Sequence, residues 1–293
     1  LPLSVDTMAL YVNRDILDAA GVPELPENWD EFVKTVKDVT RYNDGGAIVQ
    51  SGVAMGTATN IPNAFDLMAI LWMQNGLRID ERGIGTIAVR NTSEVATHPT
   101  FEALRFFTDF ARSDRDVYTW DENLNTARNE FIRGRSAFYF GYAYERADIE
   151  ARAPQLEYEI MAIPQLDPTR PKNVVNFSLQ AVSGKSDAKN EAWDFIRYMS
   201  LPQNVERYLG ATQLPTPLRS QVAAQGQLLE MEPFLDGILT ATNWYQGRNY
   251  DSANAALGTL INRYLAPVGE DINKDERDIQ VLDTFIRTVE QSQ

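Results

Sequence analysis

The stretch VYTWDENLNTARNEFIRGRSAFYFGYAYERADI, residues 117–149 of this 293-residue chain, carries the signals that decide the fold. Gly134 stands where a left-handed residue would end a helix, after apolar residues at helical spacing. The run Ser136 to Phe140 is short, apolar and aromatic, which predicts a buried strand, and Gly141 ends that strand before a second helix. The apolar residues at helical spacing are Leu124, Ala127, Phe131 and Ile132. The stretch therefore predicts a helix, a buried strand and another helix in close succession.

Two tyrosines, Tyr142 and Tyr144, follow the predicted strand directly. In an open α/β sheet, ligands bind in the crevice beyond the carboxyl ends of the strands. The same two rings could instead pack against the next helix, since tyrosine is amphipathic and serves both uses. Their position alone leaves both interpretations open.

The rest of the chain alternates short strand-like runs with helical runs and then becomes helix-rich, which predicts an α/β protein with mixed sheets. Asn13 is expected to cap a first helix, and Asn28 with Glu31 forms a capping-box pattern ahead of a second. In the run from Leu77 to Arg90, apolar and polar residues alternate around Gly83 and Gly85, which predicts a β-hairpin. Trp29, Trp72 and Trp193 stand among aliphatic residues at helical spacing and are predicted to be core residues.

Composition limits the partners and the chemistry. Hydrophobic residues at 44% and charged residues at 23% are ordinary values for a globular protein. The net charge of -14 would repel nucleic acid, so no nucleic-acid partner is expected, and a neutral or cationic ligand is favoured. The absence of cysteine excludes disulfides and thiolate nucleophiles.

Neither a catalytic histidine nor a metal site is predicted. His98 is the only histidine and precedes Pro99 at a predicted helix start, where a capping role is expected. Asp271, Asn273 and Asp275 have the spacing of calcium-loop ligands, but Glu276 stands where that loop needs glycine. We therefore expect a solvated turn in which Asp275 caps the last helix, and no metal or cofactor.

Several carboxylates lie near the aromatic stretch and leave a hydrolase open as an alternative. A glycosidase needs two carboxylates facing each other across the bond that it cleaves. Asp121, Glu122 and Glu145 are close in sequence to Tyr142 and Tyr144, but the sequence does not show that any two face one another. A structural or adhesive surface module is a third possibility.

A set of aromatic residues at element ends and in loops favours sugar binding. Sugar rings present apolar C–H faces bordered by hydroxyls, so a site for them combines flat aromatic side chains with amides and carboxylates. Asn176, Asn243 and Asp121 supply such polar neighbours. The aromatic residues of the set are Trp120, Tyr142, Tyr144, Phe177, Trp244 and Tyr245.

In several segments the chain resembles the extracellular solute-binding proteins of ABC transporters, of the maltose-binding-protein-like type (family 1) that carries sugars. The segments run in the order of that family and span nearly the whole chain. They are SVDTMALYVNRDILDAAGVPELPENWDEFVKTVKDVT, NEFIRGRSAFYFGYAYERADI, IMAIPQLDP, NFSLQAVSGKSDAKNEAWDFIRYMSLPQNVERYL, LPTPLRS and ATNWYQG.

The resemblance implies two α/β lobes joined by crossing strands, with a ligand cleft between them and a hinge that closes over it (type II). The expected second, helix-rich lobe comprises residues 7–175 and 228–293. The first lobe is expected to be incomplete, with residues 1–6 and 176–227 as its remnant and the hinge crossings. The implied protein is a monomeric binder and not an enzyme, and it delivers a mono- or oligosaccharide to a membrane permease. It would lie in the periplasm or on the outer face of the cytoplasmic membrane, lipid-anchored through a preceding segment.

The resemblance also assigns ligand contacts. Asn63 and Phe65 open the helix whose start lines the cleft in this family, and Trp120 is carried over with them. The remaining assigned contacts are Tyr142, Tyr144, Asn176, Phe177, Trp244 and Tyr245.

Overall fold

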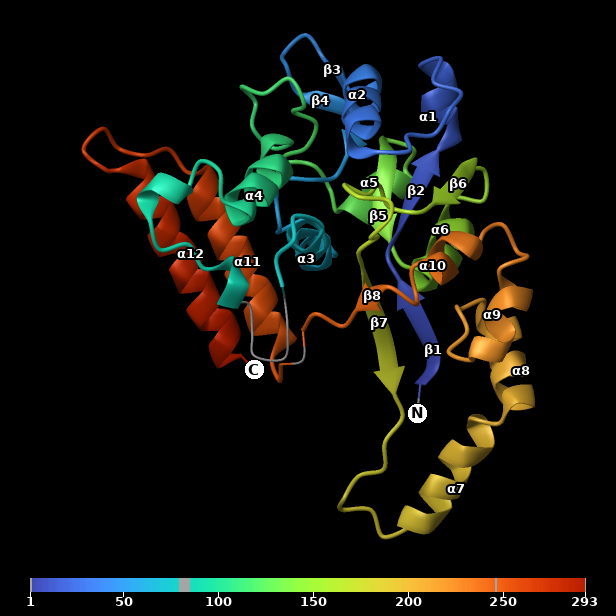
Figure 1. Cartoon of the computed structure of the whole chain (residues 1–293). Helices are drawn as coiled ribbons and strands as arrows, with labels where there is room; N and C mark the ends of the chain where they lie inside the picture. Colours follow the sequence, from blue (N-terminus) through green and yellow to red (C-terminus); the bar gives the residue numbers. More distant parts are fainter. Residues whose placement is uncertain (1, 79–84, 246, 293) are drawn as a thin grey trace.

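The computed structural model describes residues 2–78, 85–245 and 247–292, which form two sheets with helices packed beside them (Figure 1). The larger sheet has the strand order β3-β4-β5-β2-β6 and the smaller one the order β1-β7-β8. Strands β4 and β5 are parallel, as are β7 and β8, and the other pairs are antiparallel. The strands are β1 (Pro2–Thr7), β2 (Ala9–Asn13), β3 (Arg41–Tyr42), β4 (Ile48–Val53), β5 (Ser136–Gly141), β6 (Tyr158–Met161), β7 (Asn173–Leu179) and β8 (Ala241–Thr242). The predicted α/β class with mixed sheets is confirmed.

Twelve α-helices and three short 3-10 helices are present in the described ranges. The helices of the first half are α1 (Arg14–Ala19), α2 (Trp29–Val39), α3 (Ala64–Gln74), η1 (Gly85–Ile87), η2 (Thr92–Glu94), α4 (Pro99–Asp109), α5 (Ala127–Ile132), η3 (Ala143–Glu145) and α6 (Arg146–Arg152). Those of the second half are α7 (Lys189–Met199), α8 (Pro202–Thr212), α9 (Arg219–Gln225), α10 (Glu232–Asp236), α11 (Tyr250–Leu265) and α12 (Lys274–Gln291).

Strands β5 and β2 form the centre of the larger sheet. The predicted strand 136–140 is confirmed, and every residue of β5 and β2 is buried. Helix α5 ends at Ile132, and Gly134 has a φ of 68°, the left-handed conformation that glycine adopts most readily. The chain then turns directly into β5, which pairs with β2 from Ala9 opposite Gly141 to Val12 opposite Phe138.

Strands β1 and β2 are nearly one continuous strand, because only Met8 separates them (Figure 1). The first pairs with β7 in the smaller sheet, and the second lies between β5 and β6 in the larger sheet. The two sheets are therefore joined covalently by a strand that belongs to both.

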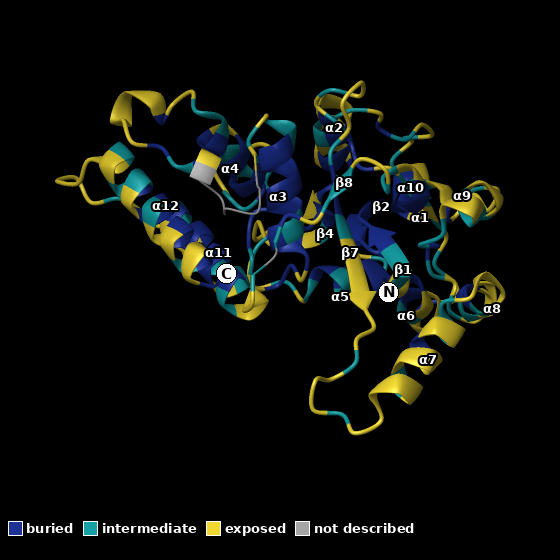
Figure 2. Cartoon of the chain, turned by 60° about the horizontal axis from the view of Figure 1, so that its bottom comes forward, coloured by how far each residue is buried: buried dark blue, intermediate teal, exposed yellow. Residues whose placement is uncertain are grey.

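Helix α3 is apolar almost all round and lies in the interior (Figure 2). Phe285 of α12 packs against Phe65 and Trp72, with ring centroids 5.8 and 5.7 Å apart respectively. Trp29 and Trp72 are buried, as predicted. The prediction for Trp193 is wrong: its side chain is 44% exposed, because helix α7 packs mainly against α8 and turns most of its surface outward (Figure 2).

Three of the predicted helix caps are confirmed. The side chains of Asn13, Asn28 and His98 accept hydrogen bonds from the backbone N–H groups of Ile16, Glu31 and Thr100. The cap of α12 was predicted wrongly.

In place of the predicted Asp275, Asn273 caps α12, and it accepts from the N–H groups of Asp275 and Glu276. Residues 79–84 of the predicted hairpin lie outside the described residues, and Gly85 to Ile87 form a 3-10 helix.

Replacing Gly141 with alanine is expected to lower the free energy of unfolding by about 2 kcal/mol, because the added methyl group overpacks the core. Its carbon would lie 2.6 Å from Cε1 of Tyr139, 2.8 Å from Oε2 of Glu145 and 3.1 Å from Cε2 of Tyr11. Urea unfolding measures the effect. In the control Gly184→Ala the methyl group meets no atom within 4 Å, so its stability should change by less than about 0.5 kcal/mol. Equal stability of the two variants would contradict the packing described here.

Candidate functional site

A cavity of about 490 Å³ lies where the carboxyl end of β5, the start of α3, strand β7 and the segment before α11 come together. It contains seven of the nine predicted contact residues, drawn from four distant parts of the chain. The lining residues are Pro62, Asn63, Asp66, Tyr142, Tyr144, Val175, Asn176, Phe177, Asn243, Trp244, Tyr245 and Tyr250.

The carboxylate of Asp66 joins two of these segments. Its Oδ2 accepts a hydrogen bond from the hydroxyl of Tyr142 at 2.7 Å, and its Oδ1 accepts one from Nε1 of Trp244 at 2.8 Å. Burial raises the pKa of Asp66, and the two hydrogen bonds oppose that rise. Asp66 thus fixes the positions of two aromatic side chains that lie far apart in sequence.

Tyr142 and Tyr144 are stacked, with ring centroids 5.7 Å apart and an interplanar angle of 14°. Their exposure differs sharply, since Tyr142 is 1% exposed and Tyr144 49%. The sequence left open whether these tyrosines contact a ligand or pack against the protein. The structure shows packing for Tyr142 and an accessible ring for Tyr144. Tyr142 packs inside the wall of the cavity, and Tyr144 presents its ring to solvent.

Glu145 organises the turn that follows β5. Its carboxylate accepts from the hydroxyl of Tyr139 at 2.5 Å, the backbone N–H of Tyr142 at 2.9 Å and Nδ2 of Asn63 at 3.3 Å. A guanidinium nitrogen of Arg128 lies 3.7 Å from it. Burial raises the pKa of Glu145, although these partners favour its charged form. Glu145 and the carbonyl of Phe140, which accepts from the same Nδ2 at 3.2 Å, therefore hold Asn63 in the lining of the cavity.

Asp6, near the end of β1, holds the same turn from the other side. Its two carboxylate oxygens accept from the backbone N–H groups of Ala143 and Tyr144 at 3.1 and 3.2 Å. Burial raises the pKa of Asp6 to about 7, and the charge of Glu145 adds to that effect. The strand that joins the two sheets is thereby hydrogen-bonded to the residues that carry Tyr144.

Rings and unpaired polar groups face the cavity together. Tyr144, Phe177 and Tyr250 are 49%, 37% and 39% exposed. Within the described part of the chain, the hydroxyls of Tyr144 and Tyr250 have no hydrogen-bond partner, and neither do the side-chain amides of Asn176 and Asn243. The cavity thus offers apolar faces beside polar groups that can bind a ligand.

Two predicted contacts lie in the core, so we correct these assignments. Phe65 is fully buried and packs against Trp244, with ring centroids 4.2 Å apart. Trp120 is also fully buried, and its Nε1 donates to Oδ1 of Asn60 at 3.0 Å. Neither side chain has surface open to the cavity.

Sequence reasoning missed Asp66 and Tyr250 as lining residues. Asp66 is the only charged residue of helix α3, AFDLMAILWMQ, and a lone acid on an otherwise apolar helix was the signal that could have identified it. Tyr250 stands at the start of α11 and carries no comparable signal.

The carboxylates that left a hydrolase open bind to the protein itself. Asp121 accepts from the hydroxyl of Tyr118 and from the N–H groups of Asn123 and Leu124. Glu122 accepts from the hydroxyl of Thr59, and neither acid lines the cavity. Among the described residues, no group of three or more His, Cys, Asp or Glu side chains could hold a metal ion. In the same ranges, no helix is long and apolar enough to cross a membrane.

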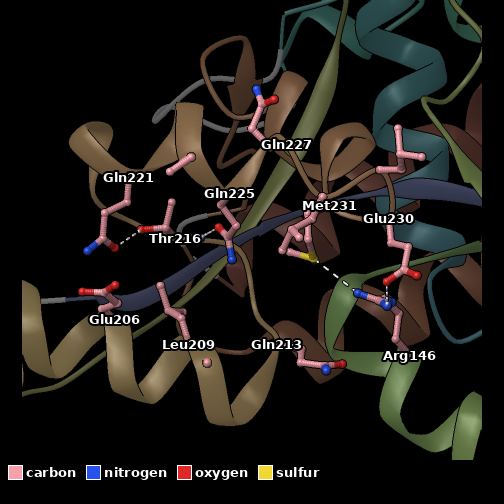
Figure 3. Close-up of a pocket in the computed structure, with 14 residues that line it drawn as sticks. Arg146, Glu206, Leu209, Gln213, Thr216, Gln221, Gln225, Gln227, Glu230 and Met231 are labelled. Carbon is pink, nitrogen blue, oxygen red and sulfur yellow. Dashed lines mark hydrogen bonds and ion pairs between the residues drawn. The ribbon is translucent and has the colours of Figure 1, made fainter.

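A larger cavity of about 910 Å³ lies between α8, α9 and the segment before α10 (Figure 3). Many of its polar side chains already bind to the protein. Arg146 pairs with Glu230 at 2.5 Å, and Gln221 accepts from the hydroxyl of Thr216 at 3.1 Å (Figure 3). Gln225 bonds to the backbone at Thr216 and Leu214. Because aromatic faces are lacking there, we place the candidate site in the smaller cavity.

Comparison with solved structures gives the same fold over essentially the whole chain. An ABC transporter solute-binding protein of Thermotoga lettingae, bound with α-D-tagatose, has a TM-score of 0.71 at 18% identity. The match covers 99% of this chain and 72% of that one. A cyclo/maltodextrin-binding protein complexed with maltotetraose also has a TM-score of 0.71, at 12% identity, with 99% and 69% covered. The two-lobed solute-binding fold expected from the sequence is thereby confirmed.

Sequence comparison agrees with the structural one. A binding protein of Brucella abortus is 22% identical over 213 residues, which are 68% of this chain and 46% of that protein. The chain thus spans about half the length of the curated relatives that it matches. The family model described as bacterial extracellular solute-binding protein matches residues 1–233. The chain therefore belongs to the family of bacterial extracellular solute-binding proteins.

Proposed function

We propose that this protein binds a mono- or oligosaccharide in the cavity lined by Tyr144, Phe177 and Tyr250. The observation that carries the proposal is that these exposed rings stand beside the unpaired amides of Asn176 and Asn243. The rings can pack against the C–H faces of a sugar, and the amides can donate to and accept from its hydroxyls. Such a site favours polyhydroxylated rings over purely apolar ligands.

The family supports a binding role. Its members and the similar solved structures are binding proteins, in agreement with the expectation that the chain is not an enzyme. Three of those structures hold tagatose, mannobiose and maltotetraose. The family is extracellular, which implies a location in the periplasm or at the outer face of the membrane.

Transport follows as part of the same proposal. Residues 7–175 with 228–293 would form one lobe, and residues 1–6 with 176–227 would belong to the other lobe and the crossings. A sugar that contacts both Tyr144 and β7 stabilises the closed arrangement, which an ABC permease then recognises. The protein would act as a monomer held near the membrane by a lipid anchor.

Adding maltotetraose, mannobiose or tagatose is expected to change the tryptophan emission and to raise the melting temperature. At a ligand concentration one hundred times Kd, stabilisation should reach about 2.7 kcal/mol. Tyr144→Ala should weaken binding by roughly tenfold, since it removes the most exposed of the aromatic rings that line the cavity. Isothermal titration calorimetry measures the affinities.

The matched control is Tyr198→Ala, which removes a 56% exposed tyrosine of α7 that does not line the cavity. It should bind as the wild type does. If no sugar in the panel produces a shift, or if both variants lose affinity equally, the proposed site is wrong.

A further inference from the structure

We infer that the preferred solute is an amino sugar, whose ammonium group pairs with Asp66. This inference rests on the proposed function, because it refines which sugar enters the same cavity.

The lining is neutral apart from one negative charge. Among the described residues that line the cavity, Asp66 is the only one with a charged side chain. A phosphorylated or carboxylated sugar would find no cation there and would meet the net charge of -14 on the whole protein. A cationic group would be attracted at long range and at the site.

Asp66 lacks the counter-ion that the neighbouring carboxylate of Glu145 has. Glu145 has the guanidinium of Arg128 at 3.7 Å, whereas Asp66 forms no ion pair with any described residue. Its two partners, the Tyr142 hydroxyl and the Trp244 indole, are neutral. A carboxylate that is largely removed from water and has no cation beside it is costly, and the same loss of water raises the pKa of Asp66. An ammonium ion from the ligand would supply the missing charge.

The geometry leaves room for that contact. Asp66 is partly exposed and lines the cavity. Each of its oxygens accepts one hydrogen bond, and a carboxylate has about four acceptor positions. An ammonium group can therefore donate to Asp66 without displacing Tyr142 or Trp244.

The surrounding rings favour the same chemistry. Six aromatic side chains line the cavity with Asp66, and an ammonium group within about 6 Å of a ring centroid is attracted to the face of that ring. Tyr144, Phe177 and Tyr250 have exposed surface for this contact. A hydroxylated ring that bears an amine would thus use the amides, the rings and the carboxylate at once.

The experiment compares three disaccharides of equal length by isothermal titration calorimetry at about pH 6, where an amine is protonated. They are chitobiose, which carries amines, N,N′-diacetylchitobiose, in which the amines are acetylated, and cellobiose, which has hydroxyls in their place. Chitobiose is expected to bind at least roughly tenfold more tightly than the other two, because a charge-assisted hydrogen bond replaces a neutral one.

Asp66→Asn should remove this preference. Asp251→Asn should retain it, because it deletes an equal charge at an exposed position of α11 outside the lining. In the wild type, the preference should also fall as NaCl is raised, since salt screens an ion pair. That measurement needs no variant to fold.

The outcomes separate the inference from the proposed function. If cellobiose binds as tightly as chitobiose, or if Asp66→Asn folds and keeps the preference, the inference is overturned and sugar binding stands. If none of the disaccharides binds and the earlier sugar panel also gives no response, both are overturned.

Discussion

Replacing Glu145 with alanine is expected to lower the free energy of unfolding by about 3 kcal/mol, one of the largest single-residue effects that the structure predicts. The change removes the acceptor for the hydroxyl of Tyr139, a buried residue of β5, and for the N–H of Tyr142 in the turn after that strand. Donors left without acceptors in the interior lose the water that they could have bound in the unfolded chain. The missing side chain also leaves a void between Asn63 and Tyr139.

Urea unfolding, followed by far-ultraviolet circular dichroism, measures this loss. The matched control is Glu157→Ala, at an exposed position with no side-chain hydrogen bond to a described residue, and it should stay within about 0.5 kcal/mol of the wild type. Glu145→Gln should fall between the two, because an amide keeps one acceptor oxygen but loses the second. A Glu145→Ala protein as stable as the control would show that the network contributes little.

The second large effect is a pH dependence that arises from Asp6. Its pKa is raised by burial from 3.8 to about 7, so the folded protein binds this proton more tightly than the unfolded chain does. The contribution of Asp6 to stability is therefore fully present below about pH 4 and is lost as the pH rises to about 7. The total is on the order of 4 kcal/mol.

The variant Asp6→Asn isolates this contribution, because an amide stays neutral at every pH. Relative to the wild type, its free energy of unfolding should rise by about 4 kcal/mol between about pH 4 and pH 7. Chemical unfolding of both proteins at a series of pH values gives the difference directly. Parallel stability curves for the two proteins would contradict the raised pKa.

Local patterns predicted local structure well. The helix and strand around Gly134 and the caps at Asn13, Asn28 and His98 depend on residues within a few positions of one another, so the sequence contains the information that they need. The cap of α12 shows the limit of this reasoning. Asn273 and Asp275 both have side chains suited to capping, and the turn before the helix selects Asn273.

Spacing along a helix does not tell whether a partner covers it. Trp193 has the spacing of a core residue, yet α7 packs mainly against α8 and leaves the indole 44% exposed. The sequence also did not predict that Tyr142 is buried and Tyr144 exposed. It depends on Asp6 and Asp66, which are 138 and 76 residues away from the tyrosines that they bind.

Seven predicted contacts came together at one cavity because the family resemblance supplied the long-range order that local patterns lack. Asp66 was missed for the opposite reason. Its neighbours in sequence are apolar, and its partners Tyr142 and Trp244 become neighbours only in the fold.

The continuous strand formed by β1 and β2 has a mechanical consequence. The β2 half is flanked by β5 and β6, whereas the β1 half lies at the edge of its sheet, where β7 is its one strand neighbour among the described residues and the N–H of Val5 also donates to the carbonyl of Pro215. Under tension along the chain, the hydrogen bonds between β1 and β7 would break first. Strand β2 would stay paired, so the separation would stop at Met8. The carboxylate of Asp6 bonds across this weak point to Ala143 and Tyr144, so the smaller sheet cannot separate without loosening the segment that carries the exposed ring.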